Sequence, residues 1–342
     1  MTNEISIKVT SNVKKEELDK FVSENPVTSI FQTPDMAEVY KRNKGCKPII
    51  LAAINENTNE ILASLLAKKL IRKPGVLESF STHSTIRGGP IFVDNKDGIK
   101  AVSLLLDEYN KIAEKEGILY TRIHPLNNTP QITDVIIENG YKQSGWQNFL
   151  IHLKRSEKEI WHDIQKPRRK NINRATDRGV TIEELNDKSQ IPVFYDLVKE
   201  TYRYAKFPLE DISNFEATFD LLVPKGMAKF YFAKHDGKPI AARLILLLKG
   251  MIYDWYAGSD RSSMEMYPND LLVWNILKYG SENGYYVFDF GGGGEPGNNE
   301  GWVEFKRRFG GELISYGRYT NTHQPTKMKL VKNMFEIYKK IL

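Results

Sequence analysis

The fold is decided by Lys229-Phe-Tyr-Phe-Ala-Lys234, the turn His235-Asp-Gly-Lys238, and Pro239-Ile-Ala-Ala-Arg-Leu-Ile-Leu-Leu-Leu248. Two runs of apolar and aromatic residues joined by a tight polar turn predict a β-hairpin. A helical pattern follows over Asn269–Asn283, and Gly284 provides a C-terminal stop. The next apolar run, Tyr285–Phe290, predicts another strand.

The first half of the chain repeats this pattern. Pro48–Ile54, a polar turn and Ile61–Ala67 predict a second hairpin. A predicted helix over Lys100–Glu116, a stop at Gly117 and a strand over Ile118–Ile123 complete the repeat. Hairpin, helix and strand in this order, twice, predict an α/β protein of two tandem domains with mixed sheets.

We therefore place an N-terminal domain over 1–152 and a C-terminal domain over 153–342, with a basic joining segment, 157–179, that we expect to be helical. A chain of 342 residues is long for one domain. Its apolar runs are too short to cross a bilayer, and its N-terminus shows no signal peptide, so we expect a cytoplasmic protein. The single cysteine, Cys46, excludes an internal disulfide framework, and the histidines show no metal-ligand spacing.

The net charge of +6 is unevenly distributed. Residues 154–178 hold nine Lys or Arg against four Asp or Glu, and residues 302–342 hold nine against three. Two basic patches in an otherwise mildly acidic chain favour a polyanionic partner, although solvated helix faces remain the ordinary alternative.

The stretch Tyr285–Gly311 carries the strongest indication of chemistry. A strand ends in four glycines, Gly291–Gly294, and Phe305-Lys306 follows after a polar loop. Glycines allow a backbone or ligand to approach closely, and a lysine beside them can stabilise an anion or a developing oxyanion. The same residues allow another interpretation, in which Phe305 is core and Lys306 is a surface side chain.

Several stretches in this order resemble the FemABX aminoacyltransferases and their BioF2-like acyltransferase relatives. They are Phe31-Gln-Thr-Pro34, Pro167-Arg-Arg-Lys-Asn-Ile-Asn-Arg174, Tyr253-Asp-Trp-Tyr-Ala-Gly-Ser259, Tyr267-Pro268, Phe288-Asp-Phe-Gly-Gly292 and Phe305-Lys306. The resemblance implies two GNAT-like domains and the attack of an amine on an activated acyl group.

The resemblance also implies roles for single residues. Phe305-Lys306 matches the family's Phe-Lys pair, which is assigned to the tRNA acceptor end and to charge in the transition state. The chain departs from the family at two places. Glu38, with Lys41 nearby, stands where a phosphate-binding lysine is expected, and His124 stands where a characterised member has an aspartate.

The remaining candidates come from residue chemistry. His124 is a candidate base near neutral pH, and Asp289 can orient or deprotonate an amine, although a hydrogen-bonded histidine and a turn-capping aspartate are the plainer interpretations. Tyr256 is a candidate lining residue. Candidate substrate-binding residues, for phosphates or close backbone approach, are Arg168, Arg169, Lys170, Arg174, Gly291, Gly292 and Lys41.

These observations favour an N-acyltransferase that forms an amide, with no cofactor and no metal. The expected donor is aminoacyl-tRNA, and the expected acceptor is an amine of a nucleotide-linked or lipid-linked cell-wall precursor, which is compatible with peripheral membrane contact. Two alternatives stay open. One is an acyl-CoA or other small-donor N-acyltransferase of the same fold, and the other is a non-catalytic module that binds polyanions.

Overall fold

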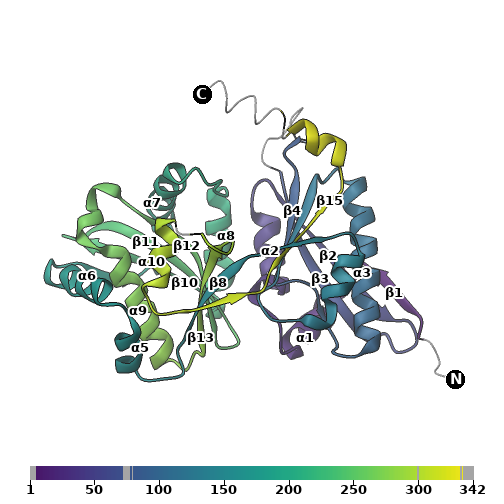
Figure 1. Cartoon of the computed structure of the whole chain (residues 1–342), viewed down its shortest axis with the longest axis horizontal. Helices are drawn as coiled ribbons and strands as arrows, with labels where there is room; N and C mark the ends of the chain where they lie inside the picture. Colours follow the sequence, from purple (N-terminus) through teal and green to yellow (C-terminus); the bar gives the residue numbers. More distant parts are fainter. Residues whose placement is uncertain (1–4, 72–77, 79, 299, 332, 334–342) are drawn as a thin grey trace. The chain divides into compact units, whose positions relative to one another are not determined.

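The structure, a computed structural model, describes residues 5–71, 78, 80–298, 300–331 and 333. The chain forms two compact units, which are described separately (Figure 1). The first unit contains residues 1–145 and 316–342, and the second contains Trp146–Ser315. This division differs from the predicted boundary at 152/153, because the strand before that boundary belongs to the second sheet and a C-terminal strand returns to the first.

The first unit is built on an eight-stranded mixed sheet of order β1-β2-β3-β4-β6-β15-β7, with β5 paired to β3. Its one parallel pair among the described residues is β4 with β6. The strands are β1 Ile7–Thr10, β2 Cys46–Asn55, β3 Ile61–Leu70, β4 His83–Arg87, β5 Ile91–Phe92, β6 Tyr120–His124, β7 Lys142–Ser144 and β15 Arg318–Thr322. The helices are α1 Lys15–Glu24, α2 Pro34–Arg42, α3 Lys96–Lys115 and α4 Thr133–Glu138, with short 3₁₀ turns η1 Ile30–Gln32 and η3 Pro130–Ile132.

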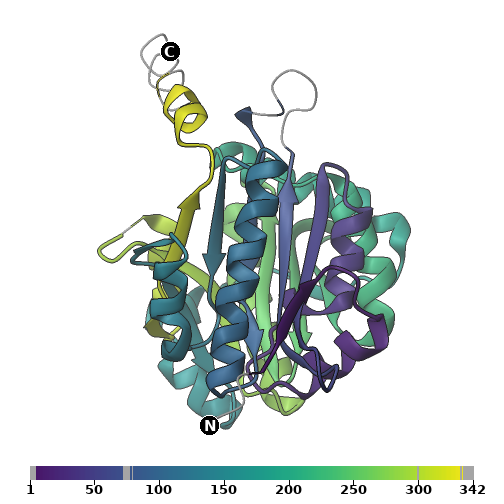
Figure 2. The same cartoon turned by 90° about the vertical axis from the view of Figure 1, so that its right-hand side faces the viewer.

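Successive side chains of β2 and β3 point to opposite faces of this sheet, so each face carries its own hydrophobic core. Leu51 and Ala53 pack with buried residues of α3, such as Leu105 and Tyr109. Ala52 points the other way and packs with Leu18 of α1. The helix α3 therefore runs across one face, as Figure 2 shows, and α1 covers part of the other.

The second unit is built on a seven-stranded mixed sheet of order β14-β8-β13-β12-β11-β10-β9, in which β12 and β13 are parallel. The strands are β8 Gln147–His152, β9 Thr181–Glu184, β10 Ala228–His235, β11 Lys238–Leu248, β12 Met251–Ser259, β13 Val287–Gly294 and β14 Glu312–Ser315. The helices are α5 Glu157–Asp163, α6 Lys166–Asp177, α7 Ile191–Tyr204, α8 Ile212–Leu222, α9 Pro268–Glu282 and α10 Gly301–Arg307, with 3₁₀ turns η4 Lys188–Gln190, η5 Val223–Lys225 and η6 Arg261–Met266.

Two layers of helix cover the second sheet. Phe230 and Phe232 of β10 contact Phe194 of α7. Their neighbours Tyr231 and Ala233 belong to the core that contains buried residues of α9. Because successive side chains of a strand point to opposite faces, α7 and α9 lie on opposite sides of the sheet.

The predicted repeat of hairpin, helix and strand is confirmed in both units. The two hairpins are β2–β3 and β10–β11. Each leads to a long helix, α3 or α9, and then to a strand, but β4 and β5 come before α3 and β12 comes before α9. Gly117 and Gly284 follow these helices with φ of 68° and 74°. Only glycine adopts this left-handed conformation without strain, which explains the stops that the sequence predicts.

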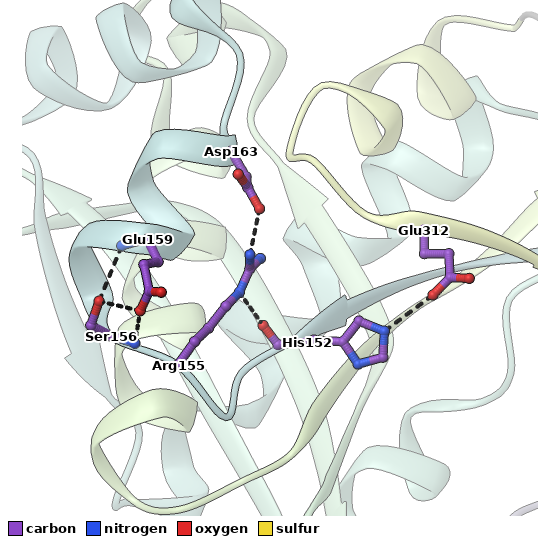
Figure 3. A network of polar contacts seen from close by, with 6 residues as sticks. All are labelled: His152, Arg155, Ser156, Glu159, Asp163 and Glu312. Carbon is purple, nitrogen blue, oxygen red and sulfur yellow. Dashed lines mark hydrogen bonds and ion pairs between the residues drawn. The ribbon is translucent and has the colours of Figure 1, made fainter.

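The basic joining segment forms two helices, α5 and α6, with a break before Pro167. Proline lacks an amide hydrogen, so it fits the first turn of α6 but not the interior of one continuous helix. The start of α5 is a capping box, in which Ser156 N–H donates to Glu159 at 2.8 Å and Glu159 N–H donates to Ser156 Oγ at 3.3 Å (Figure 3). An ion pair of 2.5 Å between Arg155 and Asp163 spans the same helix.

Candidate active site

The candidate site lies in the second unit, where two parallel strands separate. The ladder between β12 and β13 ends at the pair Tyr253–Asp289 within the described residues of these strands. Beyond that pair, β12 continues beside β11, and β13 continues beside β8. In open α/β sheets, ligands bind where neighbouring strands diverge at their carboxyl ends, so this is a suitable place for a substrate.

The glycine cluster at the end of β13 is mostly filled by the chain's own side chains. A Cβ at Gly292 would meet the Trp146 ring at 2.9 Å, and one at Gly293 would meet Phe149 at 2.9 Å. Gly291 differs, because its added Cβ would lie 3.5 Å from Lys306 Nζ and 3.7 Å from the carbonyl oxygen of Asp254. Most of the cluster therefore packs against side chains of the protein itself, and Gly291 is the glycine of the four that borders both the lysine and the facing strand.

Lys306 lies where the strands separate. Its ammonium donates to the carbonyl oxygens of Phe290 at 2.5 Å and Gly292 at 3.1 Å, both on β13. The rings of Phe290 and Trp302 lie 5.4 and 5.5 Å from the same nitrogen. Helix α10 thus delivers a cation, held by backbone and aromatic groups, to the glycine end of the strand.

Phe305 is partly buried, packs against the core and is covered on one face. The Arg168 guanidinium lies 4.5 Å from the ring centre, and Phe309 packs at 5.2 Å. Arg168 also donates to both oxygens of Asp270 on α9, at 3.0 and 3.3 Å. Burial raises the pKa of Asp270, while the charge of Arg168 opposes that rise. Arg168, predicted to bind phosphate, therefore links α6, α9 and α10 from inside the unit.

Asp289 is 3% exposed and holds the turn at the end of its strand. Its carboxylate accepts from the Asn148 side-chain amide at 3.1 Å through each oxygen, and from the Gly291 N–H at 2.8 Å. These bonds match the plainer interpretation of a turn-capping aspartate. They also place Asn148, which the sequence analysis missed, next to the glycine cluster.

Tyr256 lies in an aromatic cluster under α7 and α8. Its ring is 4.7 Å from Phe215 and 5.8 Å from Tyr202. On the same strand, Asp254 accepts from Arg243 at 2.8 Å, and their side chains are only 10% and 4% exposed. Asp254 is recognisable from the sequence as a carboxylate within an aromatic strand, but its pairing with Arg243 was not predicted, although a charged residue inside the apolar run of β11 is a recognisable signal.

The other basic candidates lie on α6. Lys170 and Arg174 are exposed and Arg169 is half-buried, whereas Ile172 and Ala175 turn into the core. This helix is therefore amphipathic, and Arg168 is the basic candidate that turns inward.

Two candidates lie in the first unit. Lys41 is exposed at the end of α2 and makes an ion pair of 3.7 Å with Glu38. His124 ends β6, and burial together with the charges of Arg87, Arg318 and Arg122 lowers its pKa to about 3. A histidine with this pKa is neutral at pH 7 and too weak a base for the role predicted from its type.

Sequence profiles match both halves of the chain. The FemAB family profile matches residues 13–139, and the acetyltransferase (GNAT) domain profile matches residues 166–307. The lipid II:glycine glycyltransferase of Staphylococcus aureus strain MRSA252 is 26% identical over 249 residues, and the counterpart from strain NCTC 8325 gives the same values. The match covers 68% of this chain and 56% of the relative, so it spans little more than half the length of these curated relatives.

The chain is similar to the FemABX proteins over most of its length.

Solved structures agree with this similarity at the level of fold. The crystal structure of FemX superposes with a TM-score of 0.70 at 18% identity, covering 94% of this chain and 99% of that one. The tandem GNAT protein from the clavulanic acid biosynthesis pathway gives 0.59 at 12% identity, covering 93% and 99%. The predicted fold of two tandem GNAT-like units is thus confirmed.

No described helix is long and apolar enough to span a bilayer. Within the same residues, no group of three or more His, Cys, Asp or Glu side chains is arranged to hold a metal ion.

The low pKa of His124 gives a testable pH dependence of stability. Between the folded value of about 3 and the ordinary value of 6.5, the unfolded chain binds a proton that the folded chain does not. Stability therefore rises with pH across this window, and acidification from about pH 6.5 to about pH 5 should cost up to about 2 kcal/mol. We expect urea unfolding of His124→Asn to show a smaller loss than the parent over this range. Equal losses in both proteins would contradict the assignment.

Proposed function

We propose that this protein is an N-acyltransferase that moves an aminoacyl group from aminoacyl-tRNA to an amine of a peptidoglycan-type cell-wall precursor. The relatives reported above are named lipid II:glycine glycyltransferases, which supports a lipid-linked acceptor. The observation that carries the proposal is the position of Lys306, whose ammonium lies at the separation of β12 and β13 beside Gly291.

The proposed reaction needs a positive charge at this place. The acceptor amine attacks the ester carbonyl carbon of the donor. The carbonyl oxygen becomes an oxyanion as the C–N bond forms. The C–O bond to the tRNA ribose then breaks, and the proton lost by the amine reaches the leaving hydroxyl. A fixed cation next to that oxygen stabilises charge that exists only in the transition state.

The other residues of the site have positioning roles in this proposal. Asp289 holds the turn at Gly291, and Arg168 with Asp270 holds the helix that carries Lys306. The proposal assigns no general base to His124 because of its low pKa.

One observation favours a second candidate donor. Stacking on the terminal base of tRNA needs an accessible aromatic face, and the Arg168 guanidinium covers one face of Phe305 at 4.5 Å. An acyl-CoA or another small donor does not require that stacking. It is therefore the alternative for the same site.

A donor comparison distinguishes the two candidates. The full chain is incubated with charged tRNAs or acyl-CoAs and with amine acceptors, and amide products are identified by mass spectrometry. We expect product from an aminoacyl-tRNA, and loss of that product when the donor is treated with RNase beforehand. Product from acyl-CoA in the presence of RNase would replace the tRNA donor with the small donor. The absence of product with every donor and acceptor would contradict the enzymatic proposal.

A further inference from the structure

Four exposed cations form one row along α6. Lys166, Lys170 and Arg174 lie at every fourth position, and Arg178 continues the row at the end of the helix. Residues four apart lie on the same face of a helix. None of the four makes an ion pair with a described residue, whereas the inward Arg168 is paired with Asp270. The row is thus an uncompensated stripe of positive charge.

Repulsion among the four cations of this row destabilises the helix. Like charges at a spacing of four destabilise a helix, because their side chains are neighbours on its surface. An external anionic surface would remove that repulsion. The helix lies at the periphery of the second unit, where such a surface has access to it (Figure 1).

The turn η6 connects this row to a second feature. At one end, the Arg178 guanidinium donates to the carbonyl oxygen of Glu265 and lies 5.6 Å from the ring of Tyr267. At the other end, the Arg261 guanidinium lies 3.5 Å from the ring of Tyr204, at the end of α7. The C-terminal ends of α6 and α7 therefore both contact this one turn.

Large apolar side chains project from these connected segments. Met264 of η6 is 57% exposed, Tyr204 at the end of α7 is 67% exposed, and Phe207 just after that helix is 54% exposed. Exposed apolar side chains near each other commonly mark an interaction site. Next to a row of lysine and arginine, they have the composition of a surface that inserts shallowly into a lipid interface.

We propose that the row Lys166, Lys170, Arg174 and Arg178, together with Tyr204, Phe207 and Met264, binds an anionic lipid bilayer. We call these residues the basic–aromatic surface. The cations contact headgroup phosphates, and the apolar side chains enter the boundary between headgroups and acyl chains. The inference rests on the proposed function in one respect: binding to the bilayer would bring the active site to a lipid-linked acceptor. RNA phosphates would match the row, but they would leave Met264 and Phe207 exposed.

Vesicle flotation with the full chain tests this inference. We expect binding to vesicles that contain phosphatidylglycerol, weaker binding to pure phosphatidylcholine vesicles, and a decrease as salt is added. The variant Lys170→Gln/Arg174→Gln should bind the anionic vesicles roughly thirtyfold more weakly, since each cation near such a surface contributes about fivefold. The variant Phe207→Ser/Met264→Ser should also weaken binding, with little change in its salt dependence.

The matched control is Lys8→Gln/Lys142→Gln, which removes two exposed cations from the first unit. It should bind vesicles like the parent. Circular dichroism should show that all variants are folded. Equal binding by parent and Lys170→Gln/Arg174→Gln, or no binding to anionic vesicles, would overturn the inference. Binding of the row to RNA in the absence of vesicle binding would also overturn it.

The outcome is separable from that of the proposed function. Vesicle binding needs no donor and no acceptor, so it is measured independently of transfer. The variant Phe207→Ser/Met264→Ser, which changes no candidate substrate-binding residue, should keep transfer to a water-soluble acceptor. Failure of transfer with vesicle binding intact would remove only the enzymatic proposal.

Discussion

Replacement of Lys306 by alanine is expected to lower kcat by about a hundredfold or more, with a small change in the affinity for the acceptor. The expected size is that of losing one group that stabilises an oxyanion, roughly 3 kcal/mol of the activation free energy. The ammonium is held by the carbonyl oxygens of Phe290 and Gly292, so its position is set before the substrate arrives. Single-turnover and steady-state rates of amide formation would measure the effect.

A neighbouring residue provides the matched control. Arg307 is on the same helix, carries the same charge and makes an exposed ion pair with Glu304. Arg307→Ala should keep kcat within a few-fold, because an exposed pair contributes little. Lys306→Arg should recover only part of the rate, because the planar guanidinium places its charge differently. Equal activity of Lys306→Ala and Arg307→Ala would contradict the proposed role of Lys306.

The second large effect concerns stability. Asp254→Ala leaves the Arg243 guanidinium buried without its counter-charge in the middle of the second sheet. Removing one partner of a buried pair typically destabilises a protein by about 3–5 kcal/mol. The loss of stability should be large here, because Arg243 Nε and Asp254 Oδ1 are already buried without a hydrogen-bond partner among the described residues. Urea unfolding followed by circular dichroism would measure the loss.

The control for that prediction is an aspartate in an exposed pair of the same unit. Asp220 binds Lys188 at 2.7 Å, and their side chains are 35% and 48% exposed. Asp220→Ala should cost less than about 1 kcal/mol. Similar losses in both variants would mean that burial does not set the energetic importance of the Arg243–Asp254 pair.

Much of the fold could be predicted because its determinants are local. Each hairpin needs only two apolar runs and a turn, and each helix stop needs only a glycine that tolerates positive φ. Even the break between α5 and α6 has a local cause in Pro167. The repeat then supplied the number of units, because a pattern that occurs twice implies a structure that occurs twice.

The site was less predictable because its contacts join distant residues. Arg168 and Asp270 lie 102 positions apart, and Asn148 and Asp289 lie 141 apart. Residue type alone could not show that Arg168 turns inward while Lys170 and Arg174 turn outward. Neither could it show that burial and three arginines lower the pKa of His124, since one of these arginines, Arg318, comes from the returning C-terminal strand.

That returning strand also affects how the protein is made. The second unit contains all its strands once Ser315 has left the ribosome, but β15 is an interior strand of the first sheet, between β6 and β7. The unit that is synthesised first is therefore completed last. Until Arg318–Thr322 arrive, β6 is paired only with β4 and has one open edge, and β7 lacks its partner β15; unpaired edges invite association with other chains. During translation, the sheet of the first unit therefore lacks β15 while the second unit is synthesised and can fold.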